Sequence, residues 1–343
     1  MTYVIIQIPC YNEEQTIGIT LSQLPKSLPG IDRLEWLIID DGCQDNTVNV
    51  ARAHGVHHVV RHTTNKGLAA AFSSGLKRGL ELGADILINT DADNQYVADD
   101  IAKLIEPLLD GRADMAVGVR AIAQIGHFSP LKKWLQRLGS WVVRHLSKAD
   151  VSDAPSGFRA ITRDAAKRLF VYNRHTYTIE TLIQSGQQNI KTISIPIRTN
   201  NNLRPSRLIK STIRYVFVSI VTMFRIYVIY NPIKFFFFIS FVFFIPGIFL
   251  FLRFLFFYVS GAGAGYIQSL VIGAVFLMTS AVLVVAGVLA DLVAVNRRHL
   301  EEIRLLMFDV RERVSALGSE GLQPKRSFID RDAANEIIED PRG

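Results

Sequence analysis

The sequence predicts an α/β domain with a doubly wound, mixed sheet, followed by a pair of long apolar helices. Between residues 3 and 120, short apolar runs alternate with polar turns and with segments of helical periodicity. The runs are rich in Val, Ile and Leu, which is typical of strands buried on both faces of a mainly parallel sheet. After about residue 205 the composition changes, because most of the 21 phenylalanines lie there.

The elements follow one another in the order βαβαβαβαβ, which is the basis for the doubly wound sheet. The expected strands cover residues 3–8, 34–39, 58–61, 86–89 and 115–119. The expected helices cover about residues 14–23, 47–53, 68–82 and 97–109, with a further helix at 177–185.

Composition excludes several classes of protein. With 343 residues and 49% hydrophobic residues, the chain is too apolar for disorder and too long for a disulfide-stapled miniprotein. Its two cysteines, Cys10 and Cys43, lack the spacing of metal ligands, so no zinc site is expected. The formal charge of +7 fits a nucleic acid, a phosphate substrate or an anionic membrane surface equally well. Charge alone therefore does not identify the partner.

Two long uncharged stretches predict a transmembrane hairpin. The first covers residues 235–252 and continues over 254–259, and the second covers 259–290. Each can supply the roughly 20 helical residues that cross a bilayer core, with the glycine-rich residues 260–265 joining them. The alternative is two buried helices of a large soluble core, but such helices rarely stay uncharged for so long.

The flanks of the hairpin predict its topology. Basic residues precede and follow the hairpin and its loop carries no charge, so the positive-inside rule places both termini in the cytoplasm. The first residues lack the basic region and cleavage site of a signal peptide. We therefore expect a cytosolic α/β domain (1–205), a juxtamembrane interface helix (206–231), the hairpin (232–291), a cytosolic amphipathic helix (292–317) and a flexible tail (318–343).

The two segments beside the hairpin have amphipathic patterns. In residues 206–229, Arg207, Lys210 and Arg214 share one helical face, as in a helix that lies in the membrane interface. A plain juxtamembrane connector is the alternative. After the hairpin, apolar residues recur with alternating steps of three and four: Leu300, Ile303, Met307, Val310, Val314 and Leu317. The same spacing extends backward through Asn296, Val293 and Leu289. This pattern would form a coiled coil in a homo-oligomer, or would pack on the membrane or on the α/β domain.

Acidic side chains follow three of the predicted strands, where doubly wound sheets bind their ligands. Glu13 follows the first strand, Asp40 and Asp41 end the second, and Asp91 and Asp93 follow the fourth. Carboxylates gathered at one edge repel one another unless a cation or hydrogen-bond donors neutralise them. Two carboxylates with open positions for water and phosphate oxygens suit Mg²⁺ or Mn²⁺. The sequence therefore indicates a metal site at Asp91 and Asp93.

Plainer interpretations of these residues remain open at this point. The Asp91–Asp93 segment could be a solvated turn, and Asp40 or Asp41 could cap a helix, with Gly42 completing the turn. Lys66 precedes a helix whose free N–H groups would face an anion, although capping alone would explain that segment. The eight histidines have no metal-ligand spacing and are assigned no chemistry.

Six motifs in this order resemble glycosyltransferase family 2, and within it the dolichol-phosphate or polyprenyl-phosphate mannose (or glucose) synthase type. The similarity covers roughly residues 3 to 208. The motifs are the Pro9–Glu13 turn, Asp40-Asp41-Gly42, Asn65-Lys66-Gly67, Asp91-Ala92-Asp93 with Gln95, Gly118-Val119-Arg120, and Ser156-Gly157-Phe158-Arg159.

The resemblance implies a GT-A fold that moves a sugar, with inversion, from a nucleotide-diphosphate donor to a polyprenyl phosphate at the membrane. It implies no nucleic-acid partner. Asp91 and Asp93 would hold the metal and the diphosphate, and Arg120 and Lys133 would be the catalytic cations beside it. Residues for the donor nucleotide would be Pro9, Tyr11, Asn12, Glu13, Asp40, Asp41, Lys66 and Gln95. Residues for the acceptor phosphate would be Ser156, Arg159, Arg204 and Arg207.

Two positions depart from the family pattern. Lys133 stands where the family has an arginine, which keeps the charge but loses the bidentate fork. The segment Arg204-Pro205-Ser206-Arg207 replaces the family's Gly-Glu-Ser-Lys, which leaves the phosphate role of Arg204 and Arg207 open.

The chemistry of this reaction is mainly positioning of charge. A metal and cationic side chains would stabilise the departing diphosphate. A phosphate monoester is largely ionised at neutral pH, so as an acceptor it needs no strong general base. Glu180 would be the base if the acceptor were a hydroxyl, as in a glycolipid synthase. A processive synthase is disfavoured because no Gln-x-x-Arg-Trp motif occurs. The rival outside enzymology is a noncatalytic membrane scaffold.

Overall fold

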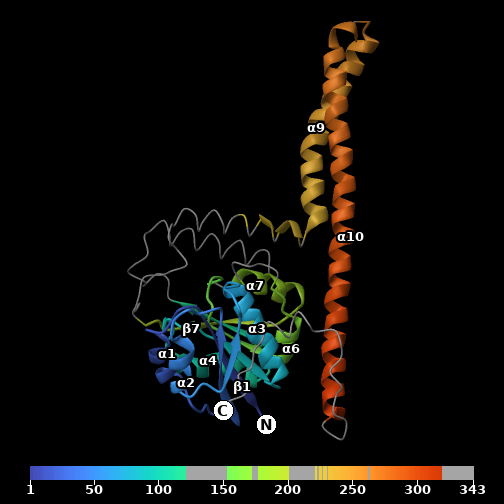
Figure 1. Cartoon of the computed structure of the whole chain (residues 1–343). Helices are drawn as coiled ribbons and strands as arrows, with labels where there is room; N and C mark the ends of the chain where they lie inside the picture. Colours follow the sequence, from blue (N-terminus) through green and yellow to red (C-terminus); the bar gives the residue numbers. More distant parts are fainter. Residues whose placement is uncertain are drawn as a thin grey trace. The chain divides into compact units, whose positions relative to one another are not determined.

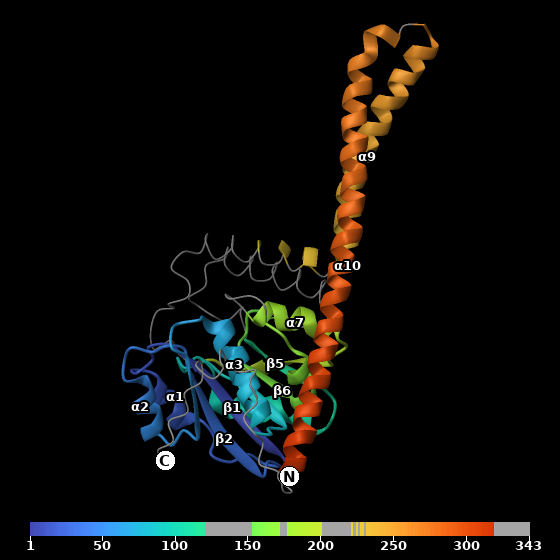
Figure 2. The same cartoon turned by 45° about the vertical axis from the view of Figure 1, so that its right-hand side comes forward.

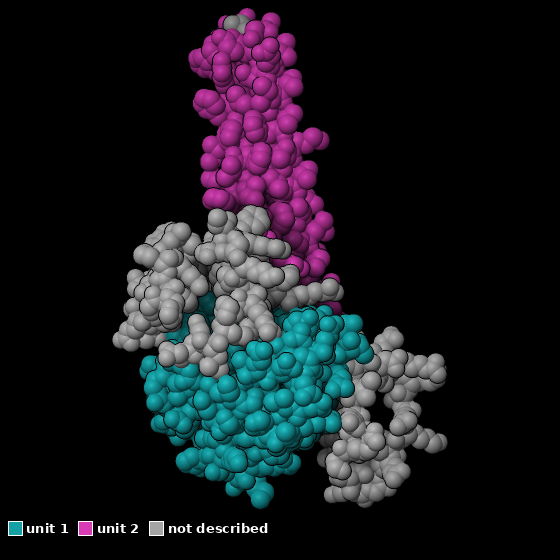
Figure 3. Space-filling model, turned by 60° about the vertical axis from the view of Figure 1, so that its left-hand side comes forward, with its two compact units in different colours: residues 1–219, 311–343 teal, residues 220–310 magenta. Residues whose placement is uncertain are grey.

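The computed structural model describes residues 1–120, 153–171, 177–200, 221, 224–225, 227–229, 231–261 and 263–318. Two compact units divide the chain, Met1–Ser219 with Arg311–Gly343, and Ile220–Val310 (Figure 3). We describe each by itself. Of the predictions above, Lys133, Arg204, Arg207, nearly all of the interface helix and the tail after residue 318 lie outside the described residues.

The first unit is built on a seven-stranded sheet of order β3-β2-β1-β4-β6-β5-β7 (Figure 1). Every neighbouring pair is parallel except those that involve β6, which runs antiparallel to both β4 and β5. The sheet is therefore mixed, as predicted. The strands are β1 (Tyr3–Cys10), β2 (Arg33–Asp40), β3 (His58–Arg61), β4 (Ile86–Asn89), β5 (Met115–Arg120), β6 (Arg159–Thr162) and β7 (Thr192–Ile197).

Helices cover both faces of this sheet, because successive side chains of a strand point to opposite faces. Ile6 of β1 belongs to one apolar cluster with Ile17 of α1 and Leu104 of α4. The neighbouring Gln7 faces α3, where a Cβ added to Gly75 would lie 2.4 Å from Gln7 Oε1. The helices are α1 (Ile17–Gln23), α2 (Thr47–Ala53), α3 (Leu68–Glu81), η1 (Ala98–Asp100), α4 (Ile101–Leu109), α6 (Arg163–Arg168) and α7 (Thr178–Gln187).

The five strands predicted from apolar runs are confirmed, with ends that shift by at most two residues. The sequence did not predict β6, α6 or β7. β6 begins with a buried arginine, and β7 is a half-buried strand that contains Pro196. A charged first residue and an internal proline both weaken the sequence signal of a buried strand.

The second unit contains two helices long and apolar enough to cross a membrane. α9 (Pro232–Val259) has a mean hydropathy of 2.6, and the candidate span Gly263–Arg297 has 2.5. The turn η3 (Gly263–Tyr266) leads into α10 (Ile267–Gly318), which has 52 residues. The predicted boundary at residue 291 therefore lies inside one continuous helix.

α9 and α10 run side by side (Figure 2), and small residues lie where the two helices contact each other. A Cβ on Gly247 would lie 3.0 Å from Leu277, and one on Gly273 would lie 3.2 Å from the Gly247 carbonyl oxygen. The hydroxyls of Ser240 and Ser280 are 2.8 Å apart and buried between the helices. Small residues and paired hydroxyls of this kind let apolar helices approach closely in a lipid environment.

Candidate active site

The carboxyl ends of four strands bring the predicted motifs together at one edge of the sheet. β1 lies between β2 and β4 and is parallel to both, so the segments that follow these strands leave the sheet at the same edge. β5 has the same direction, because it and β4 are each antiparallel to β6. Arg120 at the end of β5 thus reaches the edge occupied by Glu13, Asp41 and Asp91.

Asp91 is the most perturbed carboxyl group of this edge. Burial, followed by the negative charge of Asp93, raises the pKa of Asp91 to about 7. The positive charge of Arg120 and a hydrogen bond from Tyr96 act in the opposite direction, and Glu13 adds a further negative charge. Two repelling carboxylates with hard oxygen atoms fit a divalent cation, which would relieve this repulsion. Within the described residues, no cluster of three His, Cys, Asp or Glu side chains accompanies them, so substrate oxygens or water would complete the coordination.

Arg120 is held in place by Asp153. Its Nε donates to Asp153 Oδ2 at 2.7 Å and its Nη2 donates to Oδ1 at 3.0 Å, a two-point contact that fixes the plane of the guanidinium. Burial lowers the pKa of Arg120, but the hydrogen bonds to Asp153, together with the charges of Tyr96, Asp153 and Asp91, outweigh this and raise it. Arg120 therefore brings a permanent positive charge to the neighbourhood of Asp91.

The loop that contains Ser156 and Gly157 passes directly beside Asp91. A Cβ on Gly157 would lie 2.7 Å from Tyr177 Oη and 3.1 Å from Asp91 Oδ1, so only glycine fits there without displacement. Ser156 is fully buried, and its Oγ has no hydrogen-bond partner among the described residues. Such a group is uncommon in a folded protein and is typical of a functional position.

Arg159, predicted as an acceptor-phosphate residue, faces inward from β6. It is fully buried, and burial lowers its pKa to about 10. Its Nε donates to the carbonyl of Ser156 at 3.0 Å, and its Nη2 donates to the carbonyls of Ala154 at 3.1 Å and Thr178 at 2.9 Å. In this structure, Arg159 ties the loop to α7. Its contact with a phosphate stays a prediction.

A chain of buried amides beneath the site was missed by the sequence analysis. Gln7 Nε2 donates to Asn89 Oδ1 at 2.9 Å, and Asn89 Nδ2 donates to the Gly157 carbonyl and to Tyr177 Oη, each at 2.9 Å. These bonds connect β1, β4, the loop and α7. The available signal was one polar residue inside the otherwise apolar β1 and another at the end of the otherwise apolar β4.

Asp41 holds the loop between β3 and α3 through hydrogen bonds. Its Oδ1 accepts from the backbone N–H of Lys66 at 2.9 Å, and its Oδ2 accepts from that of Gly67 at 2.8 Å. His62, which was assigned no role, lies with Nδ1 2.7 Å from Asp41 Oδ1 and Nε2 2.9 Å from Ser74 Oγ. Asp41 thus closes the loop that carries Lys66.

Asp40 and Gln95 also take part in local hydrogen bonds. Asp40 Oδ1 accepts from the N–H of Cys43 at 2.7 Å, and its Oδ2 accepts from Arg61 at 3.0 Å. The half-buried Gln95 donates its N–H to Asp93 Oδ1 at 3.2 Å. These contacts fix the shape of the turns after β2 and β4.

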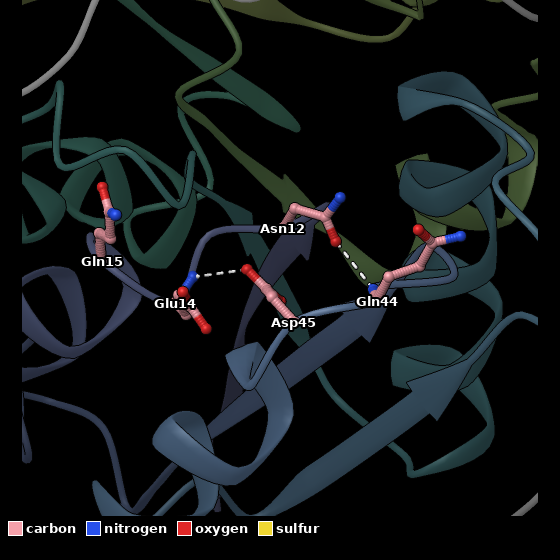
Figure 4. A pocket seen from close by; sticks show the side chains of 5 residues that line it. All are labelled: Asn12, Glu14, Gln15, Gln44 and Asp45. Atoms are coloured by element: carbon pink, nitrogen blue, oxygen red, sulfur yellow. Dashed lines mark hydrogen bonds between the residues drawn. The ribbon is translucent and has the colours of Figure 1, made fainter.

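A polar cavity of about 210 Å³ lies between the turns that follow β1 and β2 (Figure 4). Asn12 adopts a φ of 55°, and its Oδ1 accepts from the N–H of Gln44 at 2.8 Å. Asp45 Oδ2 accepts from the N–H of Glu14 at 3.2 Å. Of the predicted nucleotide residues, Asn12 lines this cavity. The half-exposed Tyr11 precedes it in the same turn, which follows Pro9 at the end of β1.

Comparison with known proteins agrees with this arrangement. The family description "Glycosyl transferase family 2" matches residues 5–170. A UDP-N-acetylglucosamine–dolichyl-phosphate N-acetylglucosaminyltransferase of Methanococcus voltae is 32% identical, over 56% of this chain and 83% of that protein. An undecaprenyl-phosphate mannosyltransferase of Micrococcus luteus is 29% identical, over 47% of this chain and 67% of that protein.

A solved structure, glucosyl-3-phosphoglycerate synthase of Mycobacterium tuberculosis, is similar with a TM-score of 0.48 and 20% identity, over 65% of this chain and 80% of that one. The Methanococcus voltae relative carries the assignment, because it is 32% identical and the chain covers 83% of its length. The sheet is the mixed α/β sheet that the sequence predicted, and the chain belongs to glycosyl transferase family 2.

Proposed function

We propose that this glycosyltransferase moves a sugar, with inversion, from a nucleotide-diphosphate donor to a polyprenyl phosphate. The observation that carries the proposal is the pair Asp91 and Asp93 beside Arg120, in a chain with two helices long enough to span a membrane. Relatives named for dolichyl phosphate and undecaprenyl phosphate acceptors support the choice of acceptor.

Asp91 and Asp93 would hold Mg²⁺ or Mn²⁺ together with the donor diphosphate. When bound, the metal supplies positive charge that stabilises the departing diphosphate. Arg120 adds a second cation on the same side, and its two bonds to Asp153 hold it without reorganisation. Lys133 is proposed as a further cation.

The donor nucleotide would occupy the edge formed by the turns after β1, β2 and β3. Asn12 and Asp45 line a polar cavity there, and Tyr11 exposes an aromatic surface that suits a base. Asp41 would act partly by accepting a hydrogen bond from the backbone of Lys66, which holds the loop of that residue in place. The full proposed set is Pro9, Tyr11, Asn12, Glu13, Asp40, Asp41, Lys66 and Gln95.

The acceptor phosphate would attack the anomeric carbon from the side opposite the diphosphate, so that one bond forms as the other breaks. Its oxygen is already ionised at neutral pH, so no proton has to be removed. Ser156, whose Oγ is buried without a partner among the described residues, is available to donate to this phosphate. Arg204 and Arg207 are proposed as further phosphate contacts.

We propose further that α9 and the first part of α10 cross the membrane as a hairpin. Basic residues on both flanks support a cytoplasmic location of both termini and of the α/β unit. An acceptor anchored in the same membrane would then present its phosphate on the cytoplasmic side, where the α/β unit would bind the donor.

The test is a transfer assay with the purified full chain in detergent. Mg²⁺ or Mn²⁺, a panel of nucleotide sugars and a polyprenyl phosphate are supplied, and the lipid product is identified by mass spectrometry. The matched acceptor control is the same polyprenol without its phosphate. We expect transfer to the polyprenyl phosphate and none to the polyprenol. NMR of the product should show that the configuration at the anomeric carbon is inverted. Transfer to the alcohol, or none across a broad panel, would falsify the proposal.

A further inference from the structure

α10 carries an exposed apolar seam that begins near the end of its candidate span and continues beyond it. We define the α10 seam as Leu289, Val293, Asn296, Leu300, Ile303, Met307, Val310 and Val314. Its members are exposed, with Val293 at 68%, Leu300 at 66% and Met307 at 68%. The steps between them alternate strictly between four and three residues, an average of 3.5, which is the period of a coiled coil.

The continuity of α10 excludes the membrane surface as the partner of this seam. A helix that lies flat in the interface has to break away from the helix that crosses the bilayer. α10 has no break between Ile267 and Gly318. The seam therefore continues along the axis of the candidate span and leaves the bilayer with it.

The seam lies on the side of α10 that faces away from α9. α10 contacts α9 through Gly273, Leu277 and Ser280. At about 100° per residue, the 27 steps from Gly273 to Leu300 place the two residues about 180° apart around the helix. α9 thus leaves the seam side of α10 uncovered.

The same side continues into the candidate span. Val275 and Val282 precede Leu289 at steps of seven residues, and both are exposed, at 60% and 62%. One uncovered apolar edge therefore runs from the middle of the hairpin past the end of the span.

We propose that the α10 seam pairs with the seam of a second copy of this chain in a parallel coiled coil. Identical helices that cross one bilayer in the same direction hold the same residue at the same depth. The two seams then meet in register, and no additional contact is needed to align them. Each Asn296 would lie opposite its counterpart, so that its amide meets another amide and not an apolar side chain of the other helix.

Cross-linking in membranes tests the pairing directly. We compare Met307→Cys, in the seam, with Glu302→Cys, on a neighbouring face of the same helix, under mild oxidation. The unsubstituted chain gives the background of Cys10 and Cys43, which are buried or half-buried. We expect a disulfide-linked dimer with Met307→Cys alone. Equal cross-linking at both positions, or background levels at both, overturns the proposal.

A second measurement follows the mass of the full chain in detergent. We expect a multiple of the 38.4 kDa chain for the wild type and for Glu302→Ala. The double variant Ile303→Asp with Met307→Asp should fall to the mass of a single chain, with the thermal transition of its α/β unit unchanged. A monomeric wild type, or a double variant that keeps the wild-type mass, overturns the proposal whether or not sugar transfer is observed.

Discussion

The α/β unit and the hairpin place their apolar side chains in opposite ways. All eight residues of β1 are buried, whereas on α9 Phe238 is 70% exposed and Phe256 is 68% exposed. Apolar surface leaves water in both cases, into a protein core in the first unit and, as we propose, into lipid in the second. The difference teaches that exposure of an apolar residue has meaning only with respect to the medium around it.

Buried polar groups also differ between the two units. In the α/β unit they form connected sets, such as Gln7, Asn89 and Tyr177, that hold the loop at Gly157. In the described part of the hairpin, the buried polar contact between the helices is a single pair, Ser240 and Ser280. The first arrangement positions a site, and the second only joins two helices.

The largest expected effect comes from Asp91→Asn. Removing a proposed metal-binding carboxylate should slow sugar transfer on the order of 10²–10³-fold, because charge on the departing diphosphate loses its stabilisation. Calorimetry with Mn²⁺ and a nucleoside diphosphate should show weaker binding. The control is Asp99→Asn, since the side chain of Asp99 is 84% exposed. An Asp91→Asn variant with wild-type turnover contradicts the role.

A pair of leucine truncations tests the contrast between the two apolar surfaces. Leu37→Ala empties a fully buried position in β2 and should lower the free energy of unfolding by about 2–5 kcal/mol. Leu252→Ala on α9 removes a side chain that is 54% exposed and should change stability by less than about 0.5 kcal/mol. Denaturation of the full chain in mixed micelles measures both. Equal losses would mean that the two environments are alike.

Glu35 should make the stability of the α/β unit depend on pH. Burial raises the pKa of Glu35, but hydrogen bonds from Tyr3, His58 and Arg33 outweigh this and lower the pKa to about 2. A lowered pKa stabilises the folded state above the ordinary value and loses this effect as pH falls from about 4.5 towards 2, by at most about 3 kcal/mol. Thermal unfolding of the wild type and of Glu35→Gln should therefore differ more at pH 7 than at pH 2. A difference that does not change with pH speaks against this.

A small loss of stability is expected from Ser240→Ala. Loss of the hydroxyl pair with Ser280 should destabilise the hairpin by about 0.6 kcal/mol, the average for such bonds between membrane helices. Ser260→Ala is the matched control, because its exposed hydroxyl only donates to Phe256 in its own helix. Unfolding of the hairpin in micelles compares the two. A larger loss for Ser260→Ala would contradict the prediction.

The sequence predicted the fold well where apolar runs are long and the site well where motifs follow a strand. β1, β2 and β4 are such runs, and their parallel pairing brings Glu13, Asp41 and Asp91 to one edge. A run of apolar residues fixes a buried strand through burial alone, so no tertiary information is needed.

The inward orientation of the Arg159 side chain could not be predicted from apolar runs. It depends on the antiparallel insertion of β6 between β4 and β5, a pairing over long sequence distances. The amide chain of Gln7 and Asn89 depends instead on the parallel pairing of β1 with β4, which places these two residues side by side. In contrast, the continuity of α10 had a signal, since the register of Leu289 and Val293 runs unbroken to Leu300 across the expected boundary.

Because α10 is unbroken, it also fixes the distance between its two ends. With a rise of about 1.5 Å per residue, its 52 residues span about 78 Å, so whatever is joined to its far end stands at a set height above the lipid. An insertion of seven residues would lift that end by about 10 Å and keep its orientation. An insertion of two residues would instead lift that end by only about 3 Å but turn it by about 200°, so height and azimuth can be altered separately.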